Sequence, residues 1–240
     1  MHILITRPLE DCKNLLIKFK NLGHMVSNLP VIKIRKVEYE DLNFNNYSAI
    51  IFTSSNSIKN LSLDKINKTI KCFCVGSVTE KFARSSGFQN VISADGNVRV
   101  LKELILQNHD KKDGKILYIS SEIISSNLDK ELSNEGYEIS RIINYTVEHI
   151  NDFQNNIIED LKKNIPDIVF VYSENSAKSF LNIIKKYQLI DSWMNTNLMC
   201  IGEKTSSVLN DVKWKKIFLF SPGEEEFLLY KVYYGYFYKF

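Results

Sequence analysis

Short apolar runs alternate with longer amphipathic runs along the chain, and this alternation limits the possible folds more than any other feature. Runs such as AIIFT from Ala49, ILYI from Ile116 and IVFVY from Ile168 are apolar throughout, which is typical of strands buried on both faces of a parallel sheet. The predicted strands are Ile3–Thr6, Val26–Ile34, Ala49–Thr53, Lys71–Val75, Asn90–Ser93, Ile116–Ile119, Glu138–Thr146, Ile168–Tyr172, Leu198–Ile201 and Ile217–Phe220.

The runs between these strands have the spacing of amphipathic helices. Leu9–Leu22 places Leu15, Leu16 and Phe19 on one face, and Gly23 follows where a helix commonly ends. The same pattern predicts helices at Val98–Leu106, Ser125–Asn134 and Asn175–Tyr187. Alternating strands and helices predict an α/β fold with parallel sheets.

Three pairs of similar segments recur in a consistent order. ILITRP from Ile3 is similar to ILYISS from Ile116, IIFTSSNS from Ile50 to VFVYSENS from Val169, and CVGSVT from Cys74 to CIGEKT from Cys200. The order A, B, A′, B′ predicts two similar three-layer α/β domains. The first domain is discontinuous, at 1–34 plus 151–240, and the second is 39–145, with connectors at 35–38 and 146–150.

Composition excludes several classes of protein. Hydrophobic residues make up 44% and charged residues 25%, as in a globular protein, and the net charge of +3 is too small for a nucleic-acid-binding face. No run of about 18 apolar residues exists, and the start MHILITRPLED does not resemble a signal peptide. We therefore expect a cytoplasmic protein, with no membrane or nucleic-acid partner, whose four cysteines are reduced thiols. The four histidines have no metal-ligand spacing.

Polar clusters follow four of the predicted strands, where ligands bind in open α/β sheets. They are Ser54–Ser57, Ser173–Ser176, Gly76–Thr79 and Gly202–Thr205. Their side chains either cap the following helices or bind an anion together with the exposed backbone N–H groups. Because the clusters occur in matching pairs in the two domains, we favour ligand binding over capping alone. Arg7, directly after the first strand, either binds a carboxylate or is an ordinary surface arginine.

Known catalytic motifs are missing. There is no GxGxxG, and GEKT at Gly202–Thr205 lacks the earlier glycine of a phosphate loop. There is no GxSxG, and Cys12 has no histidine nearby in the sequence. If the protein is an enzyme, we expect it to work without a metal, a covalent nucleophile or an obvious acid–base pair.

The chain resembles the uroporphyrinogen-III synthase family. The resemblance rests on short motifs that run in the family's order to about Leu229. They are ITRP at Ile5–Pro8, PVI at Pro30–Ile32, FTSSNS at Phe52–Ser57, VGSVT at Val75–Thr79, INYTV at Ile143–Val147, VYSENSAKSF at Val171–Phe180 and IGEKT at Ile201–Thr205.

The resemblance implies a fold, a reaction and a set of site residues. The family has two α/β domains joined by a two-stranded linker with a cleft between them, and converts hydroxymethylbilane to uroporphyrinogen III. Water is lost, ring D is inverted, and no cofactor is used. The site expected here has Thr79, Tyr145 and Asn144 as catalytic residues. The expected substrate-binding residues are Arg7, Thr53, Ser54, Ser55, Asn56, Gly76, Ser77, Ser120, Ser121, Ser173, Asn175, Gly202 and Thr205. The alternative is a non-catalytic relative that binds tetrapyrroles or carboxylates.

This chain departs from the family's pattern at three places. The family often has tyrosine where Asn144 stands, and a shift by one position in a strand turns a side chain to the other face. We therefore expect Tyr145 to point away from the cleft unless a bulge restores it. Ser120–Ser121 stand where relatives tend to have Arg-Gly. The tail Lys231–Phe240 has no counterpart and is either a helical extension or an amphipathic anchor. We expect a monomer, with hydroxymethylbilane synthase as its upstream partner.

Overall fold

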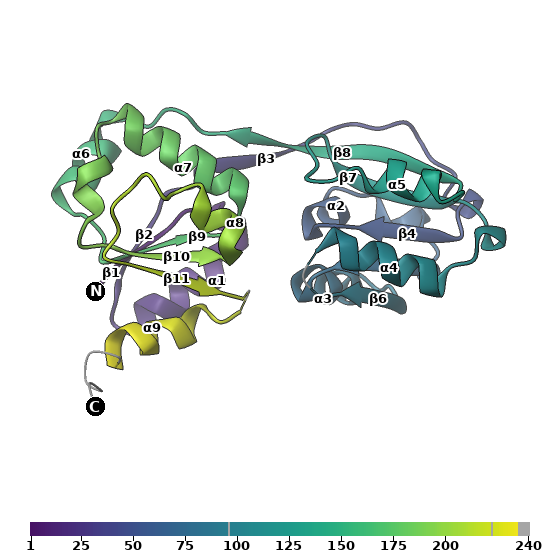
Figure 1. The fold of residues 1–240 in the computed structure, drawn as a ribbon, viewed down its shortest axis with the longest axis horizontal. Helices are drawn as coiled ribbons and strands as arrows, with labels where there is room; N and C mark the ends of the chain where they lie inside the picture. The colour runs from purple at the N-terminus through teal and green to yellow at the C-terminus, as the bar shows by residue number, and fades with distance from the viewer. Residues whose placement is uncertain (96, 222, 235–240) are drawn as a thin grey trace. The chain divides into compact units, whose positions relative to one another are not determined.

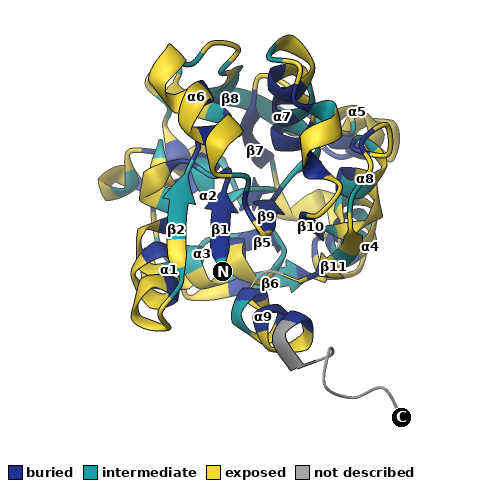
Figure 2. Ribbon diagram, turned by 90° about the vertical axis from the view of Figure 1, so that its left-hand side faces the viewer, coloured by how far each residue is buried: buried dark blue, intermediate teal, exposed yellow. Residues whose placement is uncertain are grey.

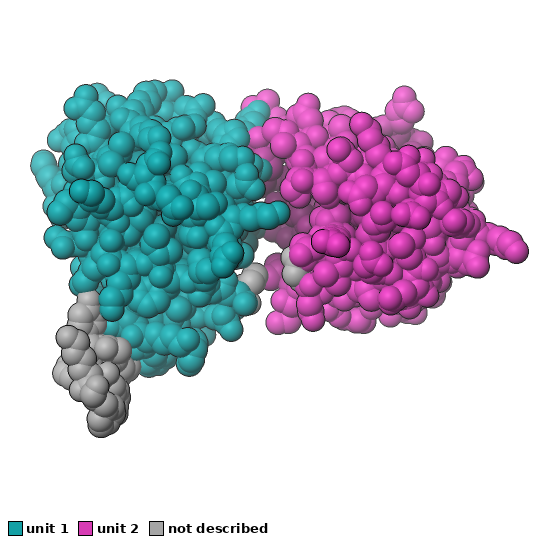
Figure 3. Space-filling view, viewed as in Figure 1, with its two compact units in different colours: residues 1–33, 148–240 teal, residues 34–147 magenta. Residues whose placement is uncertain are grey.

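The computed structural model describes residues 1–95, 97–221 and 223–234. The chain divides into two compact units, which Figure 3 colours separately. Unit 1 comprises Met1–Lys33 and Glu148–Phe240, and unit 2 comprises Ile34–Val147. The chain passes from one unit to the other within the strands Ile32–Lys36 and Ile139–His149.

Unit 1 is built on a five-stranded parallel sheet with the order β11-β10-β9-β1-β2 (Figure 1). Its strands are β1 (His2–Ile5), β2 (Met25–Asn28), β9 (Ile168–Val171), β10 (Asn197–Ile201) and β11 (Lys216–Phe220). Its helices are α1 (Leu9–Asn21), α6 (Asn155–Lys163), α7 (Glu174–Lys186), α8 (Gly202–Ser207) and α9 (Glu225–Tyr234). Apolar side chains of α1 and α9 pack on one face of the sheet and those of α6 and α7 on the other.

Unit 2 is built on a six-stranded sheet with the order β3-β8-β7-β4-β5-β6. Its strands are β3 (Ile32–Lys36), β4 (Ala49–Phe52), β5 (Lys71–Val75), β6 (Asn90–Ala94), β7 (Ile116–Ser121) and β8 (Ile139–His149). Apolar side chains of α2 (Ser55–Lys59) and α3 (Ser77–Ser85) cover one face, and those of α4 (Val98–Asn108) and α5 (Leu128–Asn134) cover the other. Short 3-10 turns lie at Phe44–Asn46, Leu63–Lys65, Lys111–Asp113 and Ile190–Trp193.

The two sheets have the same strand order. The order β2-β1-β9-β10-β11 in unit 1 matches β8-β7-β4-β5-β6 in unit 2, and the similar sequence pairs fall on β1 and β7, β9 and β4, and β10 and β5. The prediction of two similar three-layer α/β domains with parallel sheets is therefore confirmed.

Burial explains why the central strands are apolar throughout. β1, β4, β7 and β9 are buried along their whole length, because helices cover both faces of each sheet (Figure 2). The unit 1 core includes both tryptophans of the chain: the ring centroids of Trp193 and Trp214 are 5.7 Å apart, and those of Trp193 and Phe180 are 5.3 Å apart.

The prediction of one strand over Val26–Ile34 is wrong. The chain forms β2 in the unit 1 sheet, leaves it after Asn28, and enters the unit 2 sheet as β3 at Ile32. Pro30 lies in the gap, and proline has no N–H group to donate to a sheet.

The sequence showed no apolar run long enough to span a membrane. Among the described residues, no helix combines the length and apolar character needed to cross a membrane. Of the tail Lys231–Phe240, residues 231–234 form the last turn of α9, and residues 235–240 lie outside the described residues.

Candidate functional site

In each sheet there is one point where the direction in which successive strands are added reverses. Open α/β sheets bind ligands at this switch point, at the carboxyl ends of the strands. In unit 1 this point lies between β1 and β9, and in unit 2 between β7 and β4. The predicted residues Arg7 and Ser173 follow the first pair of strands, whereas Ser54, Ser120 and Ser121 follow or end the second pair. We call these two places, at the carboxyl ends of the strands, the unit 1 edge and the unit 2 edge.

Serine caps the helix that follows one strand at each edge. Ser54 accepts a hydrogen bond of 3.2 Å from the N–H of Asn56, and Ser173 accepts one of 3.1 Å from the N–H of Ser176. The expected capping role of both serines is thus real. Thr53 lies beside Ser54, with its hydroxyl 3.3 Å from the hydroxyl of Tyr118.

A β-bulge in the middle of β8 reverses the orientation that regular strand alternation predicts for Tyr145. Ser120 pairs with Ile143 but Ser121 pairs with Tyr145, so Asn144 is one extra residue in the strand. An extra residue breaks the strict alternation of side chains. Asn144 consequently donates from Nδ2 to the carbonyl of Ser57 at 2.6 Å, and the next residue, Tyr145, also faces the serines around α2.

The Tyr145 hydroxyl lies in a buried group of polar side chains. Burial raises the pKa of Tyr145 above its ordinary value, while the hydroxyls of Ser54, Ser57 and Ser121 beside it partly oppose that shift. The side chain is 6% exposed. Tyr145 therefore remains a protonated hydrogen-bond donor at neutral pH. We call Ser54, Ser57, Ser121, Asn144 and Tyr145 the Tyr145 cluster.

Several buried polar atoms of this cluster lack hydrogen-bond partners. Within the part of the chain that the structure describes, Ser57 Oγ, Ser121 Oγ and Asn144 Oδ1 are buried and have none. Such atoms are rare in folded proteins, because each one loses its hydration without compensation. Three of them around one tyrosine hydroxyl mark this edge as a place where a polar ligand or water can bind.

Glycines with a left-handed backbone precede repeat-related helices in the two units. Gly76 (φ 79°) precedes α3, and Gly202 (φ 71°) begins α8. Three residues after each lies a buried threonine, Thr79 at 5% and Thr205 at 4% exposure. The N-cap of α3 is Gly76, so the expected alternative that Thr79 caps this helix is wrong.

The remaining predicted residues of unit 2 differ in exposure. Ser77 is exposed, whereas Ser55 and Asn56 are half-buried at the start of α2. Ser120 is fully buried, and its hydroxyl accepts a hydrogen bond of 2.8 Å from Nε of Arg141.

Arg7 at the unit 1 edge is oriented by its neighbours. Its guanidinium carbon lies 4.6 Å from the ring centroid of Tyr172, and its carbonyl accepts a hydrogen bond of 2.9 Å from Asn28. Stacking on a ring face leaves the guanidinium edges able to bind a carboxylate. Asn175 lies half-buried near the start of α7, next to Ser173.

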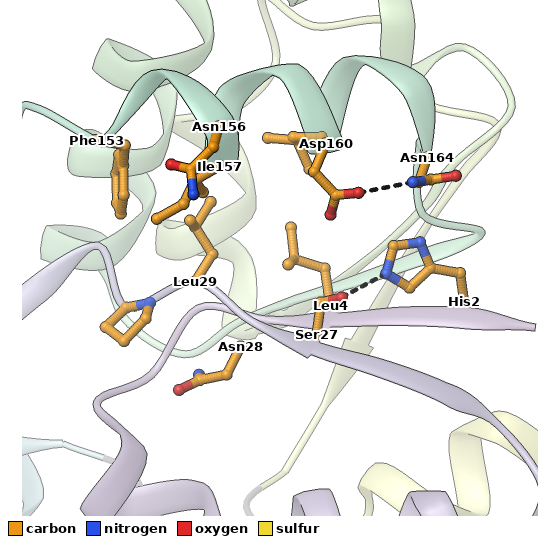
Figure 4. A pocket seen from close by; sticks show the side chains of 12 residues that line it. His2, Leu4, Ser27, Asn28, Leu29, Phe153, Asn156, Ile157, Asp160 and Asn164 are labelled. Carbon is orange, nitrogen blue, oxygen red and sulfur yellow. Dashed lines mark hydrogen bonds between the residues drawn. The ribbon is translucent and has the colours of Figure 1, made fainter.

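A separate cavity of about 470 Å³ lies in unit 1, between α6 and the strands β1 and β2 (Figure 4). Its polar side chains bond to one another: His2 Nε2 lies 2.8 Å from Ser27 Oγ, and Asn164 donates to Asp160 at 2.8 Å. The lining includes no lysine or arginine and does include the carboxylate of Asp160. The cavity therefore does not suit an anionic ligand.

Metal binding finds no support at either edge. Over residues 1–95, 97–221 and 223–234, no group of three histidine, cysteine, aspartate or glutamate side chains could hold a metal ion.

Three residues of these edges were not predicted from the sequence, and a fourth, Ser57, was predicted as part of a polar cluster but not as a site residue. Ser57 lies one helical turn from Ser54 in the SSNS motif, so helix periodicity could have indicated it. Tyr172 directly follows β9 and could have been chosen for that position. Tyr118 and Arg141 lie within strands, and only their contacts reveal them.

Comparisons with known proteins agree with the fold. The family model described as "Uroporphyrinogen-III synthase HemD" matches residues 14–220. The chloroplastic uroporphyrinogen-III synthase of Oryza sativa subsp. japonica is 29% identical over 104 residues, which are 43% of this chain and 32% of the rice protein. The match thus spans about a third of that relative's length.

Two solved structures are similar over nearly the whole chain. Uroporphyrinogen-III synthetase from Helicobacter pylori 26695 has a TM-score of 0.65 and 17% identity, with 96% of this chain and 99% of that chain covered. A mutant uroporphyrinogen III synthase from the extremely thermophilic bacterium Thermus thermophilus has a TM-score of 0.61 and 14% identity, with 95% and 96% covered. At these identities the likeness shows a shared fold.

Proposed function

The chain belongs to the uroporphyrinogen-III synthase HemD family, and from this premise we propose that it cyclises hydroxymethylbilane to uroporphyrinogen III. In this reaction the C–O bond of the terminal hydroxymethyl group breaks and the oxygen leaves as water. The freed methylene carbon then bonds to the substituted carbon of ring D, which already carries the bridge to ring C. That older C–C bond breaks, and the bridge carbon bonds instead to the unsubstituted α-carbon of ring D, which loses its proton, so that this ring is inverted in the product. We propose that no cofactor takes part.

We propose that the polar edges of both units bind parts of one substrate. The substrate has eight carboxylates, and the Arg7 guanidinium at the unit 1 edge suits one of them. The N-termini of α3 and α7 add backbone N–H groups and favourable dipoles for others. Thr79 and Thr205, at matching positions of the two units, supply hydroxyl donors.

The Tyr145 cluster supports the chemical step. A leaving hydroxide needs a proton. Burial raises the pKa of Tyr145 and makes it a weak acid, so it stays protonated at neutral pH and stabilises the departing oxygen through its hydrogen bond. The hydroxyls of Ser57 and Ser121 lie beside that of Tyr145 and can orient the departing oxygen. We propose that Tyr145 donates to this oxygen and that Asn144 acts on Tyr145 indirectly, by holding the α2 segment at Ser57.

Orientation of the substrate is the larger part of the proposed catalysis. The bilane closes without help to the uninverted isomer, so the enzyme has to favour attack by one carbon over another. Holding reactants in a productive geometry can contribute about 7–11 kcal/mol in well-aligned cases. Many fixed hydroxyl and amide donors serve this task better than a single strong acid or base.

The observation that best supports this proposal is the Tyr145 cluster at the carboxyl ends of the unit 2 strands in a member of the HemD family. Analysis of the product isomers tests the proposal. Porphobilinogen and hydroxymethylbilane synthase generate the substrate in the cuvette, and the products are oxidised and separated by chromatography. Type III product supports the proposal. Type I product alone supports the alternative, a non-catalytic relative that binds tetrapyrroles or carboxylates. We propose a monomer that receives its substrate from hydroxymethylbilane synthase.

A further inference from the structure

Arg141 on β8 bonds to the end of β7 at three acceptors. Its Nε donates to Ser120 Oγ at 2.8 Å, and its Nη2 donates to the carbonyls of Ser121 at 2.8 Å and of Glu122 at 3.1 Å. Arg141 lies three residues before the extra residue Asn144. One planar guanidinium thus ties the two strands together where their regular pairing shifts.

Glu122 fastens the same segment on the other side of the bulge. Its N–H donates to the carbonyl of Tyr145 at 3.0 Å, and its carboxylate accepts a hydrogen bond of 2.8 Å from Thr146. The end of β7 is therefore held to β8 both before and after Asn144.

A bulge has to be stabilised, because it interrupts the ladder of hydrogen bonds between two strands. Bulges are rare in a parallel pair of strands. If β8 paired regularly through Asn144, with no bulge, Tyr145 would face the other side of the sheet. We propose that Arg141 is a positioning residue that fixes the bulge at Asn144 and so keeps the Tyr145 side chain on the α2 face.

The proposal separates Arg141 from a direct substrate contact. Nε and Nη2 already donate to protein acceptors, and the geometry of all three bonds needs a planar fork that lysine lacks. Arg141 acts through Tyr145, so its importance for the reaction rests on the proposed function. Its effect on the position of Tyr145 is independent of that function.

A double-mutant cycle tests the link to the reaction. Arg141→Lys keeps the charge and should lower kcat about tenfold or more, with KM changed less than about threefold, because a misplaced group costs rate. In a Tyr145→Phe background the same substitution should change kcat less than about twofold, because coupled residues are not additive. Equal losses in both backgrounds, or a loss confined to KM, would overturn the proposal.

A second measurement needs no activity. Tyrosine labelled with ¹³C at Cζ gives one NMR signal per ring, and the Tyr145→Phe variant identifies the signal of Tyr145. We expect this signal to move in Arg141→Lys and to stay in place in Arg84→Lys. Arg84 is the matched control, since it too donates from Nε to a side chain, that of Glu80, and from Nη2 to a backbone carbonyl, that of Val91, elsewhere in unit 2.

The outcomes are distinguishable. An unmoved Tyr145 signal in Arg141→Lys overturns the positioning role, whatever the activity. A moved signal in Arg141→Lys, together with a wild-type protein that forms no type III product, supports the positioning role and contradicts the proposed function. If Arg141→Lys does not fold, Glu122→Ala removes only the carboxylate contact with Thr146, on the other side of the bulge. We expect the Tyr145 signal to move in this variant, and an unmoved signal would contradict the proposal that these contacts fix the bulge.

Discussion

The side-chain amide of Asn144 donates a 2.6 Å hydrogen bond to the backbone carbonyl of Ser57, 87 residues earlier in the chain. Both groups are buried, and the bond ties the bulged strand β8 to the first turn of α2. Asn144 and Tyr145 therefore both face α2, but they have different tasks: one holds the segment and the other presents a hydroxyl.

Asn144→Ala should lower stability. The substitution leaves the Ser57 carbonyl without its donor, and an unsatisfied buried group costs about 1–3 kcal/mol. Urea unfolding of the variant measures this loss. Asn46→Ala, at an exposed asparagine of the same unit, should leave the free energy of unfolding nearly unchanged. Equal stability of both variants would contradict the assigned role.

Tyr145→Phe should lower kcat by about ten to a hundredfold, near the low end of the effect of a general acid. Tyr137→Phe is the matched control, because it removes a hydroxyl that bonds to His109 near the amino end of β8. The control should retain full activity. Since burial raises the pKa of Tyr145, the wild-type rate should show no loss from tyrosine ionisation below about pH 10. Unchanged turnover in Tyr145→Phe would remove Tyr145 from the proposed mechanism.

Arg7→Lys should raise KM about tenfold with a smaller change in kcat. Lysine cannot form a bidentate contact with a carboxylate and lacks the planar face that stacks on Tyr172. Steady-state kinetics with enzymatically generated hydroxymethylbilane give both constants. Arg99→Lys, at an exposed position on α4, serves as the control. A KM equal to that of the control would mean that Arg7 does not bind substrate.

Thr79→Ala should lower turnover about tenfold while the melting temperature changes little. Gly76 occupies the N-cap of α3, so loss of the Thr79 hydroxyl removes no cap. Thr205→Ala tests the matching position in unit 1. A fall in melting temperature with an unchanged rate would show that these hydroxyls are structural.

Acid should destabilise unit 2 through His109. Burial lowers the pKa of His109 below the usual value of about 6.5, whereas the unfolded chain binds a proton near that value. As the pH falls through about 6.5, the unfolded state gains a proton that the folded state resists, so the free energy of unfolding decreases. Amide hydrogen exchange in β4, β5 and β7 at pH 7.5 and 5.5 (about two units apart) measures the change.

His109→Gln is the corresponding variant. Glutamine keeps a hydrogen-bonding group near Ser48 and Gly114, whose oxygen atoms each lie 3.3 Å from His109 Nε2, but it does not titrate. Its exchange protection should therefore depend less on pH than that of the wild type. The same pH dependence in both proteins would assign the acid sensitivity to other groups.

Much of the fold follows from local sequence patterns. Apolar runs of four or five residues predicted the central strands, because burial on both faces leaves no room for polar alternation. The three repeated pairs predicted two similar domains, and the two sheets indeed share a strand order. The continuous prediction over Val26–Ile34 failed because no local pattern shows that a chain leaves one sheet and joins another.

The candidate site was predictable only in part. Ser54 and Ser173 were predicted from their places after buried strands, and both cap helices. The orientation of Tyr145 was not predictable from strand alternation, because one extra residue reverses it. The contacts that support that residue come from Arg141 and Glu122, and they depend on the pairing of β7 with β8.

The position of β1 in its sheet affects how the chain folds during synthesis. β1 lies between β2 and β9, and β9 is made about 160 residues after β1. Residues 34–147 are contiguous, so unit 2 can fold on the ribosome while β1, with only β2 beside it, still lacks its other neighbour β9. The N-terminal apolar strand must therefore stay accessible, and protected from aggregation, until residues 168–220 have emerged.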